Sequence, residues 1–257
     1  MIVNARMYSV TPQVKAAWKT LLQSVIVHAR LDWEILDYDA PAPLAALWAR
    51  DDLGCAMMCG LPYSQRKPRP LLVAAPVPSP ARYGGRPVYF TDLAVRADSS
   101  YTTLEDTFGA VAGYTLEDSM SGCVAFRHHL LKYERKNLYR SFVGNLIHGR
   151  RVIEALVAGT IDVGPLDSYY YDLLRVHDPA TAALVRVVAS TAAAPIPPLV
   201  ATAPLSSAEL ERLRAALLAA SEEPGLRAER ETLLLSRFAV PDPADYDVFD
   251  DILRETQ

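Results

Sequence analysis

Residues 114–122 read Tyr-Thr-Leu-Glu-Asp-Ser-Met-Ser-Gly, and this stretch decides how the rest of the chain is interpreted. It follows the apolar run 108–113, typical of a buried strand, and precedes residues 123–131, whose apolar side chains recur at helical spacing. The first amides of a helix have no intrahelical partner and attract negative charge. Two interpretations follow: Ser119 or Ser121 caps a helix, or the two serines and the amide of Gly122 bind an anion.

Composition narrows the classes of protein. A chain of 257 residues, 51% hydrophobic and 22% charged, is long enough for one large domain or two small lobes with a buried core. The net charge of −4 provides no basic surface for nucleic acid or an anionic membrane. The 3 cysteines argue against a disulfide framework and a zinc site. We expect no cofactor, no metal and no nucleic-acid partner. We also expect no membrane insertion, because no apolar run approaches the roughly 18 residues of a membrane helix.

The N-terminal segment bears on the compartment. Residues 1–10 lack the basic, apolar and small-residue parts of a signal peptide. Taken alone, this segment predicts a cytoplasmic protein, unless a leader has been removed.

Strand-like and helical patterns alternate along most of the chain. Helices are expected at 12–27, 148–158, 207–220 and 227–235, and strands at 53–59 and 160–164, with a further helix opening at Pro165. This alternation predicts an α/β fold with mixed, mostly parallel sheets flanked by helices. Two extended stretches, near 86–95 and 190–200, join the half-chains and are the expected hinge. They predict a discontinuous first lobe, 1–90 plus 196–257, and a second lobe, 91–195.

Four loops follow predicted strands, where ligands collect in such sheets. They contain Tyr8 and Ser9, residues 59–63, residues 119–122 and residues 167–169. Two of these loops fall in each predicted lobe, so we expect them to face one another across a ligand cleft.

Two motifs resemble those of a known family. Residues 118–122 (Asp-Ser-Met-Ser-Gly) and 159–168 (Gly-Thr-Ile-Asp-Val-Gly-Pro-Leu-Asp-Ser) are similar to the phosphate, phosphite and phosphonate solute-binding proteins of ABC transporters. Residues 58–63 and 89–91 support the resemblance more weakly. It covers essentially the whole chain and implies a two-lobe type II periplasmic-binding fold. It also implies a periplasmic monomer without enzymatic activity, which binds a small anionic or zwitterionic solute and delivers it to an ABC permease.

The resemblance also implies roles for individual residues. Ser119, Ser121 and the amide of Gly122 would hold the phosphonate oxygens, and Asp167 would take an ammonium group or a protonated ligand oxygen. The remaining members of the expected ligand set are Tyr8, Ser9, Cys59, Tyr63, Thr91, His148, Ser168 and Tyr169.

The sequence departs from the family pattern at one place. The family carries Gly-Ser-His with a serine soon after, whereas residues 146–149 read Leu-Ile-His-Gly and Val152 stands where that serine would be. One anion-binding corner is kept and the second is altered, which bears on whether the ligand is a phosphonate.

Several residues also have plain structural interpretations. Asp167 and His148 are candidates for a helix cap and a solvated residue, respectively. Cys59 is either a nucleophile or a small core residue. Tyrosines 169–171 are either packing residues or, in part, ligands to ferric iron. His128 and His129 point to different helix faces, so they are not expected to share a metal ion.

Two other functions remain open at this stage. Menaquinone-pathway chorismate dehydratases and pyrimidine-forming enzymes of thiamine synthesis resemble type II binding proteins without leaders. A cytoplasmic enzyme of that kind would use Asp167 or His148 as acid or base. A cytoplasmic ligand sensor on the same fold is the third alternative, since fold alone does not choose among them.

Overall fold

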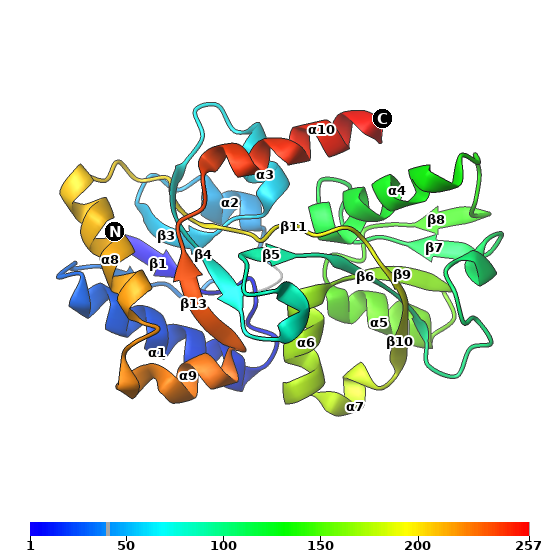
Figure 1. Cartoon of the computed structure of the whole chain (residues 1–257), viewed down its shortest axis with the longest axis horizontal. Coiled ribbons are helices and arrows are strands. Elements are labelled where there is room, and N and C mark those ends of the chain that lie inside the picture. Colours follow the sequence, from blue (N-terminus) through cyan, green and yellow to red (C-terminus); the bar gives the residue numbers. More distant parts are fainter. Residues whose placement is uncertain (40–41, 257) are drawn as a thin grey trace. The chain divides into compact units, whose positions relative to one another are not determined.

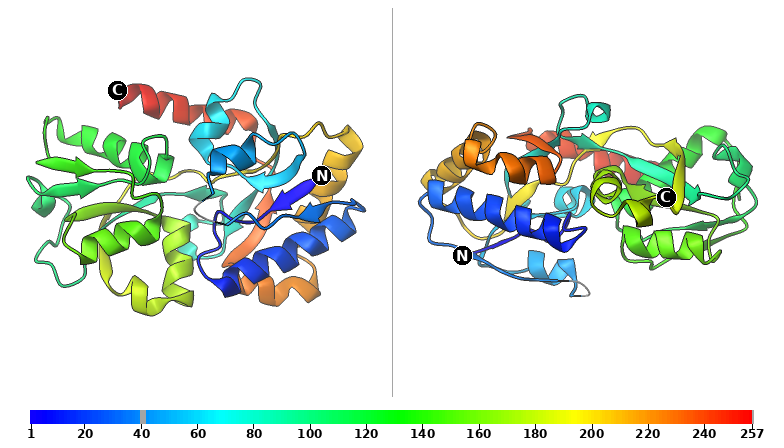
Figure 2. Two further views of the ribbon diagram at one scale, coloured as in Figure 1. Left: turned by 180° about the vertical axis from the view of Figure 1, so that it is seen from behind. Right: turned by 90° about the horizontal axis from the view of Figure 1, so that it is seen from below.

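Two mixed β-sheets organise the residues described by the computed structural model, which are 1–39 and 42–256 (Figures 1 and 2). The chain divides into a first unit, Met1–Val88 with Pro195–Tyr246, and a second unit, Tyr89–Ala194 with Asp247–Gln257. Residues 247–257 were expected to belong to the first lobe. The structure instead groups the C-terminal helix α10 (Val248–Glu255) with the second unit, where it packs against α4 (Ala125–Leu130).

The first unit holds the larger sheet. Its strands lie in the order β13 (Leu235–Ala239), β4 (Leu71–Pro78), β12 (Leu199–Ala201), β3 (Leu53–Met57), β1 (Ile2–Asn4) and β2 (Glu34–Ile35). Its helices are α1 (Pro12–His28), α2 (Leu44–Trp48), α3 (Gly60–Gln65), α8 (Ser207–Ala219) and α9 (Arg227–Thr232). β1 runs parallel to β2 and β3, whereas β12 and β13 pair antiparallel with their neighbours.

Helix α1 illustrates why these segments fold as they do. Thr11 Oγ1 accepts the amide of Val14 at 3.3 Å, and Pro12 occupies the first turn, where its missing N–H costs nothing. Trp18 recurs on the buried face with Leu21, Leu22 and Val25 at helical spacing. Its indole lies 6.5 Å from the ring of Phe238 on β13, so the helix packs against the sheet edge.

The second unit is built around the sheet that matters for the candidate site. Its strands lie in the order β10 (Val185–Ser190), β6 (Thr91–Arg96), β9 (Val163–Asp167), β7 (Val111–Gly113) and β8 (Ser141–Val143). Its other helices are α5 (Gly149–Val157), α6 (Ser168–His177) and α7 (Pro179–Ala182). The two-stranded sheet of β5 (Val88–Tyr89) and β11 (Ala194–Pro195) lies where the chain changes units.

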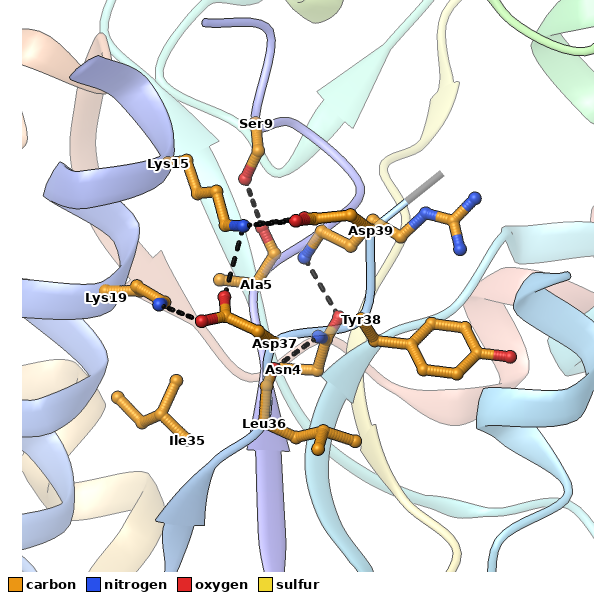
Figure 3. A pocket seen from close by; sticks show the side chains of 11 residues that line it. Asn4, Ala5, Ser9, Lys15, Lys19, Ile35, Leu36, Asp37, Tyr38 and Asp39 are labelled. Carbon is orange, nitrogen blue, oxygen red and sulfur yellow. Dashed lines mark hydrogen bonds and ion pairs between the residues drawn. The ribbon is translucent and has the colours of Figure 1, made fainter. Parts of the chain in front are cut away.

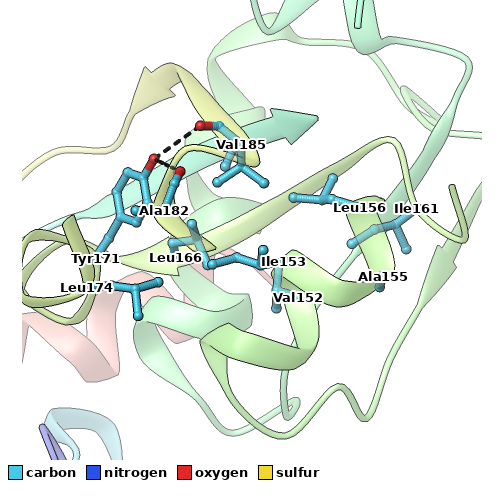
Figure 4. Close-up of a cluster of buried hydrophobic side chains, with 11 residues drawn as sticks. Val152, Ile153, Ala155, Leu156, Ile161, Leu166, Tyr171, Leu174, Ala182 and Val185 are labelled. Carbon is cyan, nitrogen blue, oxygen red and sulfur yellow. Dashed lines mark hydrogen bonds between the residues drawn. The ribbon is translucent and has the colours of Figure 1, made fainter. Parts of the chain in front are cut away.

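Both faces of this second sheet are covered, as the alternation along β6 shows. Ala94 joins a cluster with α5 and α6 that includes Val152, Leu166 and Tyr171 (Figure 4). Its neighbours Leu93 and Val95 point the opposite way, into a cluster with Phe126 of α4. Burial on both faces explains why β7 lies within a continuous apolar run, residues 108–113.

The α/β sheets flanked by helices are confirmed, but antiparallel pairs are more common than the strand–helix alternation predicted. Among the described residues, parallel pairing is confined to β2, β1 and β3 in the first sheet and to β9, β7 and β8 in the second. The reason is that β6 and β12 enter their sheets antiparallel to the neighbouring strands.

Two further expectations were wrong in detail. The helix expected from Pro165 begins instead at Ser168, because residues 163–167 continue as β9 and pair antiparallel with β6 along their whole length. The helix expected over 227–235 ends at Thr232. Leu234 then adopts a left-handed φ of 47°, and the chain continues as β13, which was not predicted.

Candidate functional site

The corner between β7 and α4 forms the predicted strand–helix transition. A π-helical turn, Met120–Val124, precedes α4, and Ser119 lies at its N-terminus with extended backbone angles. The Oγ of Ser119 accepts the amide of Gly122 at 3.2 Å. The capping interpretation therefore holds for Ser119, and the Gly122 amide, expected to face a ligand, already has a partner.

Gly122 is required by its neighbour Thr115. A Cβ built at Gly122 would lie 1.7 Å from the Thr115 Oγ1 and 2.8 Å from the Ser119 Oγ. The backbone amide of Thr115 also donates to the Gly122 carbonyl at 2.9 Å, so the two segments are held in close contact. The glycine permits this contact within the corner.

Two other amides at the start of the turn remain available. Those of Met120 and Ser121 have no hydrogen-bond acceptor within residues 1–39 and 42–256. They lie at the N-terminus of the continuous helical segment formed by the π-turn and α4, where the backbone dipoles favour an anion. These two amides are therefore the candidate donors of the corner to an anion.

Ser121, Asp167 and Thr91 meet at the sheet edge. The Ser121 Oγ donates to the Asp167 Oδ2 at 3.3 Å, and the Thr91 Oγ1 donates to the Ser121 carbonyl at 3.0 Å. Thr91 and Asp167 are paired in the β6–β9 register, which places the first residue of one strand opposite the last of the other. Sequence motifs more than 70 residues apart are thus brought into one hydrogen-bonded group.

Asp167 also caps α6. Its Oδ1 accepts the amides of Tyr169 at 3.0 Å and Tyr170 at 3.1 Å, while its Oδ2 faces Ser121. The sequence left capping and ligand contact as alternatives for this residue, and the structure shows that one carboxylate oxygen performs the capping. The other oxygen lies beside the anion corner, where it can accept from a cationic or protonated group.

Ser168 and Tyr169 lie next to this group and are fully buried. The Ser168 Oγ accepts the amide of Phe90 at 3.0 Å, and the Ser168 amide donates to the Phe90 carbonyl at 2.9 Å. Burial raises the pKa of the Tyr169 phenol far above its usual range, so the phenol is neutral. These contacts hold the start of α6 against the chain preceding β6.

His148 lies at the same edge of the sheet because β8 runs parallel to β7. It is exposed and caps α5, with its Nδ1 accepting the Arg151 amide at 3.4 Å. Val152, which stands where the family has a serine, is completely buried in the cluster of Figure 4. The second anion corner is therefore absent from the described part of this loop in the form that the family pattern implies.

The tyrosines after Asp167 pack within the second unit. The Tyr171 hydroxyl donates to the carbonyls of Ala182 at 3.1 Å and Val185 at 3.3 Å. The Tyr170 ring covers Gly149, where a Cβ would lie 2.6 Å from the ring. Across the described residues, no group of three His, Cys, Asp or Glu side chains is placed to hold a metal ion.

The remaining predicted residues belong to the first unit. Tyr8 and Ser9 follow β1, and Cys59 and Tyr63 follow β3; these strands are parallel, so both loops leave the same edge of the first sheet. The Ser9 Oγ donates to the Ala5 carbonyl at 2.6 Å. Tyr63 is buried, and its ring lies 5.0 Å from that of Tyr246 in an edge-on contact.

A charged cluster at this edge of the first sheet was not predicted. The Lys15 ammonium lies 2.6 Å from the Asp39 carboxylate and 3.1 Å from that of Asp37, which also pairs with Lys19 at 2.6 Å (Figure 3). The hollow beside them measures about 10 Å³, room for little more than a water molecule. Lys15 and Lys19 are one helical turn apart on α1, so the sequence places them on one face of the helix. Their partners Asp37 and Asp39 follow β2, and the sequence gives no sign of that pairing.

The fold and the corner define a class: two α/β units, one of which presents paired amides, a serine and a carboxylate at the carboxyl edge of its sheet. The sequence matches the family described as "ABC transporter, phosphonate, periplasmic substrate-binding protein" over residues 10–246. The chain belongs to this family of transport proteins. The family match supports the binding-protein interpretation over the cytoplasmic enzyme.

Solved structures share the fold at low sequence identity. The binding-protein component of an ABC phosphonate transporter from Pseudomonas aeruginosa aligns with a TM-score of 0.81 at 18% identity, covering 100% of this chain and 86% of that one. A Prochlorococcus marinus protein in complex with methylphosphonate aligns at 0.81 and 13% identity, covering 99% and 97%. A Xanthomonas citri protein bound to ATP aligns at 0.67 and 20% identity, covering 100% and 96%. No curated protein matches the sequence.

No helix in the described part of the chain is both long enough and apolar enough to span a membrane.

Proposed function

We propose that this protein binds a small phosphonate-like solute at the β7–α4 corner and acts as the substrate-binding component of an ABC importer. The family match and the fold support the class of function. The fold leaves the ligand open, since its structural relatives include one solved with methylphosphonate and one solved with ATP. The ligand is therefore inferred from the corner itself.

The observation that carries the proposal is the contact of Ser121 with Asp167, beside the free amides of Met120 and Ser121. In this proposal the amides and the Ser121 hydroxyl donate to phosphonate oxygens as charge-assisted hydrogen bonds. The Ser121 hydroxyl rotates away from Asp167 when it does so, which leaves the carboxylate oxygen able to accept from the ligand.

Asp167 restricts the ligand further. An ionised carboxylate only accepts hydrogen bonds, and it repels a second anion placed within a few ångström. A ligand that carries an ammonium group, or a phosphonate oxygen that keeps its proton, satisfies both Asp167 and the amides. The altered second corner, with Val152 buried, removes donors that a fully ionised phosphonate would otherwise use.

The contributions of Tyr8, Ser9, Cys59 and Tyr63 to ligand binding stay predictions from the family resemblance. The same holds for Thr91, His148 and Ser168, each of which makes a hydrogen bond within the second unit, and for the buried Tyr169. A periplasmic location, a permease partner and a monomeric state complete the proposal.

Titration calorimetry with methylphosphonate, 2-aminoethylphosphonate, phosphite and phosphate tests this function. We expect 2-aminoethylphosphonate to bind more tightly than methylphosphonate and to remain chemically unchanged. Ser121→Ala removes a hydrogen bond to a charged group and is expected to weaken binding by about 10–100-fold, from roughly 1.5–3 kcal/mol. The matched control is Ser141→Ala. Ser141 is exposed and begins β8, so it lies at the end of the sheet opposite the corner.

Two results would contradict the proposal. If none of the four compounds binds, the corner does not recognise phosphorus oxyanions. If Ser121→Ala and Ser141→Ala bind equally well, the solute is held elsewhere.

A further inference from the structure

A second cavity lies within the second unit, behind the β7–α4 corner. Its volume is about 240 Å³, and every residue that lines it belongs to this unit. Residues 89–91 and 191–194, where the chain enters and leaves the unit, form one wall. The helical segment of Met120, His129 and Lys132 forms another, and Ile252 of α10 closes the end. The cavity is smaller than the roughly 300–1,000 Å³ of drug-sized sites, so it suits a small molecule.

The lining of this cavity is amphipathic. Tyr89 and Met120 are buried, and alanines 192–194 and Ile252 add further apolar surface. The basic side chains lie on the α4 side, where the Lys132 Nζ lies 2.9 Å from the His129 Nε2, and Thr91 and Thr191 add hydroxyl groups to the other wall. A lysine ammonium only donates, so His129 accepts this hydrogen bond with a neutral ring. Burial, followed by the charge of Lys132, lowers the pKa of His129, in agreement with a neutral ring.

The charges at the rim favour an anion. The nearby Glu255 carboxylate is paired with the His128 Nε2 at 2.9 Å, so it is already engaged by α4. Lys132 is exposed, and its ammonium lies 4.9 Å from the ring of Tyr133, a contact that an anion would not disrupt. One positive charge beside an apolar hollow matches a ligand with one negative charge and an apolar body.

We propose that this cavity binds a small hydrophobic monocarboxylate, of the size of an aromatic acid or a short-chain fatty acid. The carboxylate accepts from Lys132, and the apolar body lies against Met120, Ile252 and the alanines of residues 192–194. An occupant of this size fits within the 240 Å³ of the cavity.

This cavity shares a wall with the anion corner. Met120 lies between Ser119 and Ser121, and Thr91, which lines the cavity, donates to the Ser121 carbonyl at 3.0 Å. A ligand against Met120 and Thr91 therefore changes the position of the Ser121 amide and hydroxyl. The coupling that follows rests on the proposed function, whereas carboxylate binding itself does not. Coupling between two ligands is reciprocal, so each must change the affinity of the other by the same factor.

An NMR chemical-shift titration of the full chain tests the proposal, with benzoate and hexanoate as probes and benzyl alcohol as the uncharged analogue of benzoate. We expect saturable shifts for Lys132, His129 and Ile252, with benzoate binding at least about tenfold more tightly than benzyl alcohol. Lys132→Met removes that preference. Lys136→Met, which removes an exposed lysine outside the cavity, is the matched control.

A variant that fills the cavity gives an independent measurement. Ala125 lines the cavity, and Ala125→Leu reduces the cavity volume while Lys132 is kept. Leucine favours a helix, so α4 is retained. The affinity for benzoate should fall by about tenfold or more. Circular dichroism and the melting temperature establish that the variant is folded.

The outcomes separate the two proposals. Absence of saturation by either acid, equal binding to Lys132→Met and Lys136→Met, or shifts confined to residues outside the cavity would overturn the carboxylate site. Methylphosphonate is titrated separately. If it fails to bind, the proposed function is contradicted while the benzoate titration still decides the cavity. If both bind and neither changes the dissociation constant of the other, the coupling is refuted.

Discussion

Replacing Gly122 with alanine tests whether the glycine is required by Thr115 or by a ligand. The added Cβ would lie 1.7 Å from the Thr115 Oγ1, whereas ordinary contact begins at 3.4 Å, so one of the two groups must move by about 1.7 Å. Thr115 is 7% exposed, and the loop that carries it is tied to Gly122 by a backbone hydrogen bond of 2.9 Å. There is thus little free space for the displacement.

The expected cost follows from measurements on overpacked interiors, which give about 1–3 kcal/mol. Because the clash involves the side chains of Ser119 and the buried Thr115, in a corner held by hydrogen bonds, we expect Gly122→Ala to destabilise the protein by about 3 kcal/mol. For a chain of 257 residues the melting temperature should fall by about 6–12 °C, at roughly 2–4 °C per kcal/mol. Gly225→Ala is the matched control, since its Cβ meets only the end of the Glu223 side chain at 3.4 Å.

A double-mutant cycle identifies the cause. Thr115→Ala removes the atom at 1.7 Å and leaves the Thr115 Cβ at 2.9 Å, so the double variant should recover about half of the lost stability. Differential scanning calorimetry of the four proteins measures the coupling. The reasoning is refuted if Gly122→Ala melts like the control while losing methylphosphonate binding, because the glycine would then serve the ligand and not Thr115.

Two further predictions concern titrating groups. Hydrogen bonds from the amides of Thr102 and Thr103 lower the pKa of Asp106 to about 2, so its stabilising effect is complete above about pH 4 and is lost as the pH falls towards 2. Asp106→Asn should therefore lower the urea midpoint of unfolding at neutral pH, and the midpoint should then fall less between pH 4 and 2. The control is Asp118→Asn, which replaces another exposed aspartate. If the midpoint of Asp106→Asn falls as steeply as that of Asp118→Asn, the prediction is contradicted. Burial raises the pKa of the Cys55 thiol to about 12 and that of Cys123 to about 11, so at pH 8 about one molecule in a thousand or fewer carries either thiolate. Both should react with a disulfide reagent only after unfolding, and peptide mapping that finds rapid labelling of either in the native protein would show that these thiols are accessible.

Local patterns predicted the elements whose stabilising contacts are short-range. Helix α1 matched the expected range almost to the residue because Thr11 and Pro12 specify its start and its apolar positions specify its buried face. The capping role of Ser119 was also among the predicted alternatives, since a cap needs only the next three residues. Family motifs then extended these local assignments to a whole fold.

Elements set by distant partners were not accessible to the same reasoning. Residues 233–235 form a leucine run that fits a helix or a strand. Only the pairing of β13 with β4, about 160 residues earlier, decides for a strand. Likewise, Pro165 suggested the start of a helix, but antiparallel pairing of residues 163–167 with β6 keeps the chain extended up to Asp167.

The candidate site follows the same division. The sequence indicated which residues form the corner. Their roles depend on contacts that the sequence spacing does not specify: Ser121 with Asp167, Gly122 with Thr115, and Thr91 with the Ser121 carbonyl. The motif predicted that the amide of Gly122 faces a ligand. The structure shows that this amide donates to the Ser119 Oγ, whereas the amides of Met120 and Ser121 have no acceptor among the described residues. A serine-rich corner therefore indicates where an anion can bind, whereas the identity of its donors depends on how each serine is used within the fold.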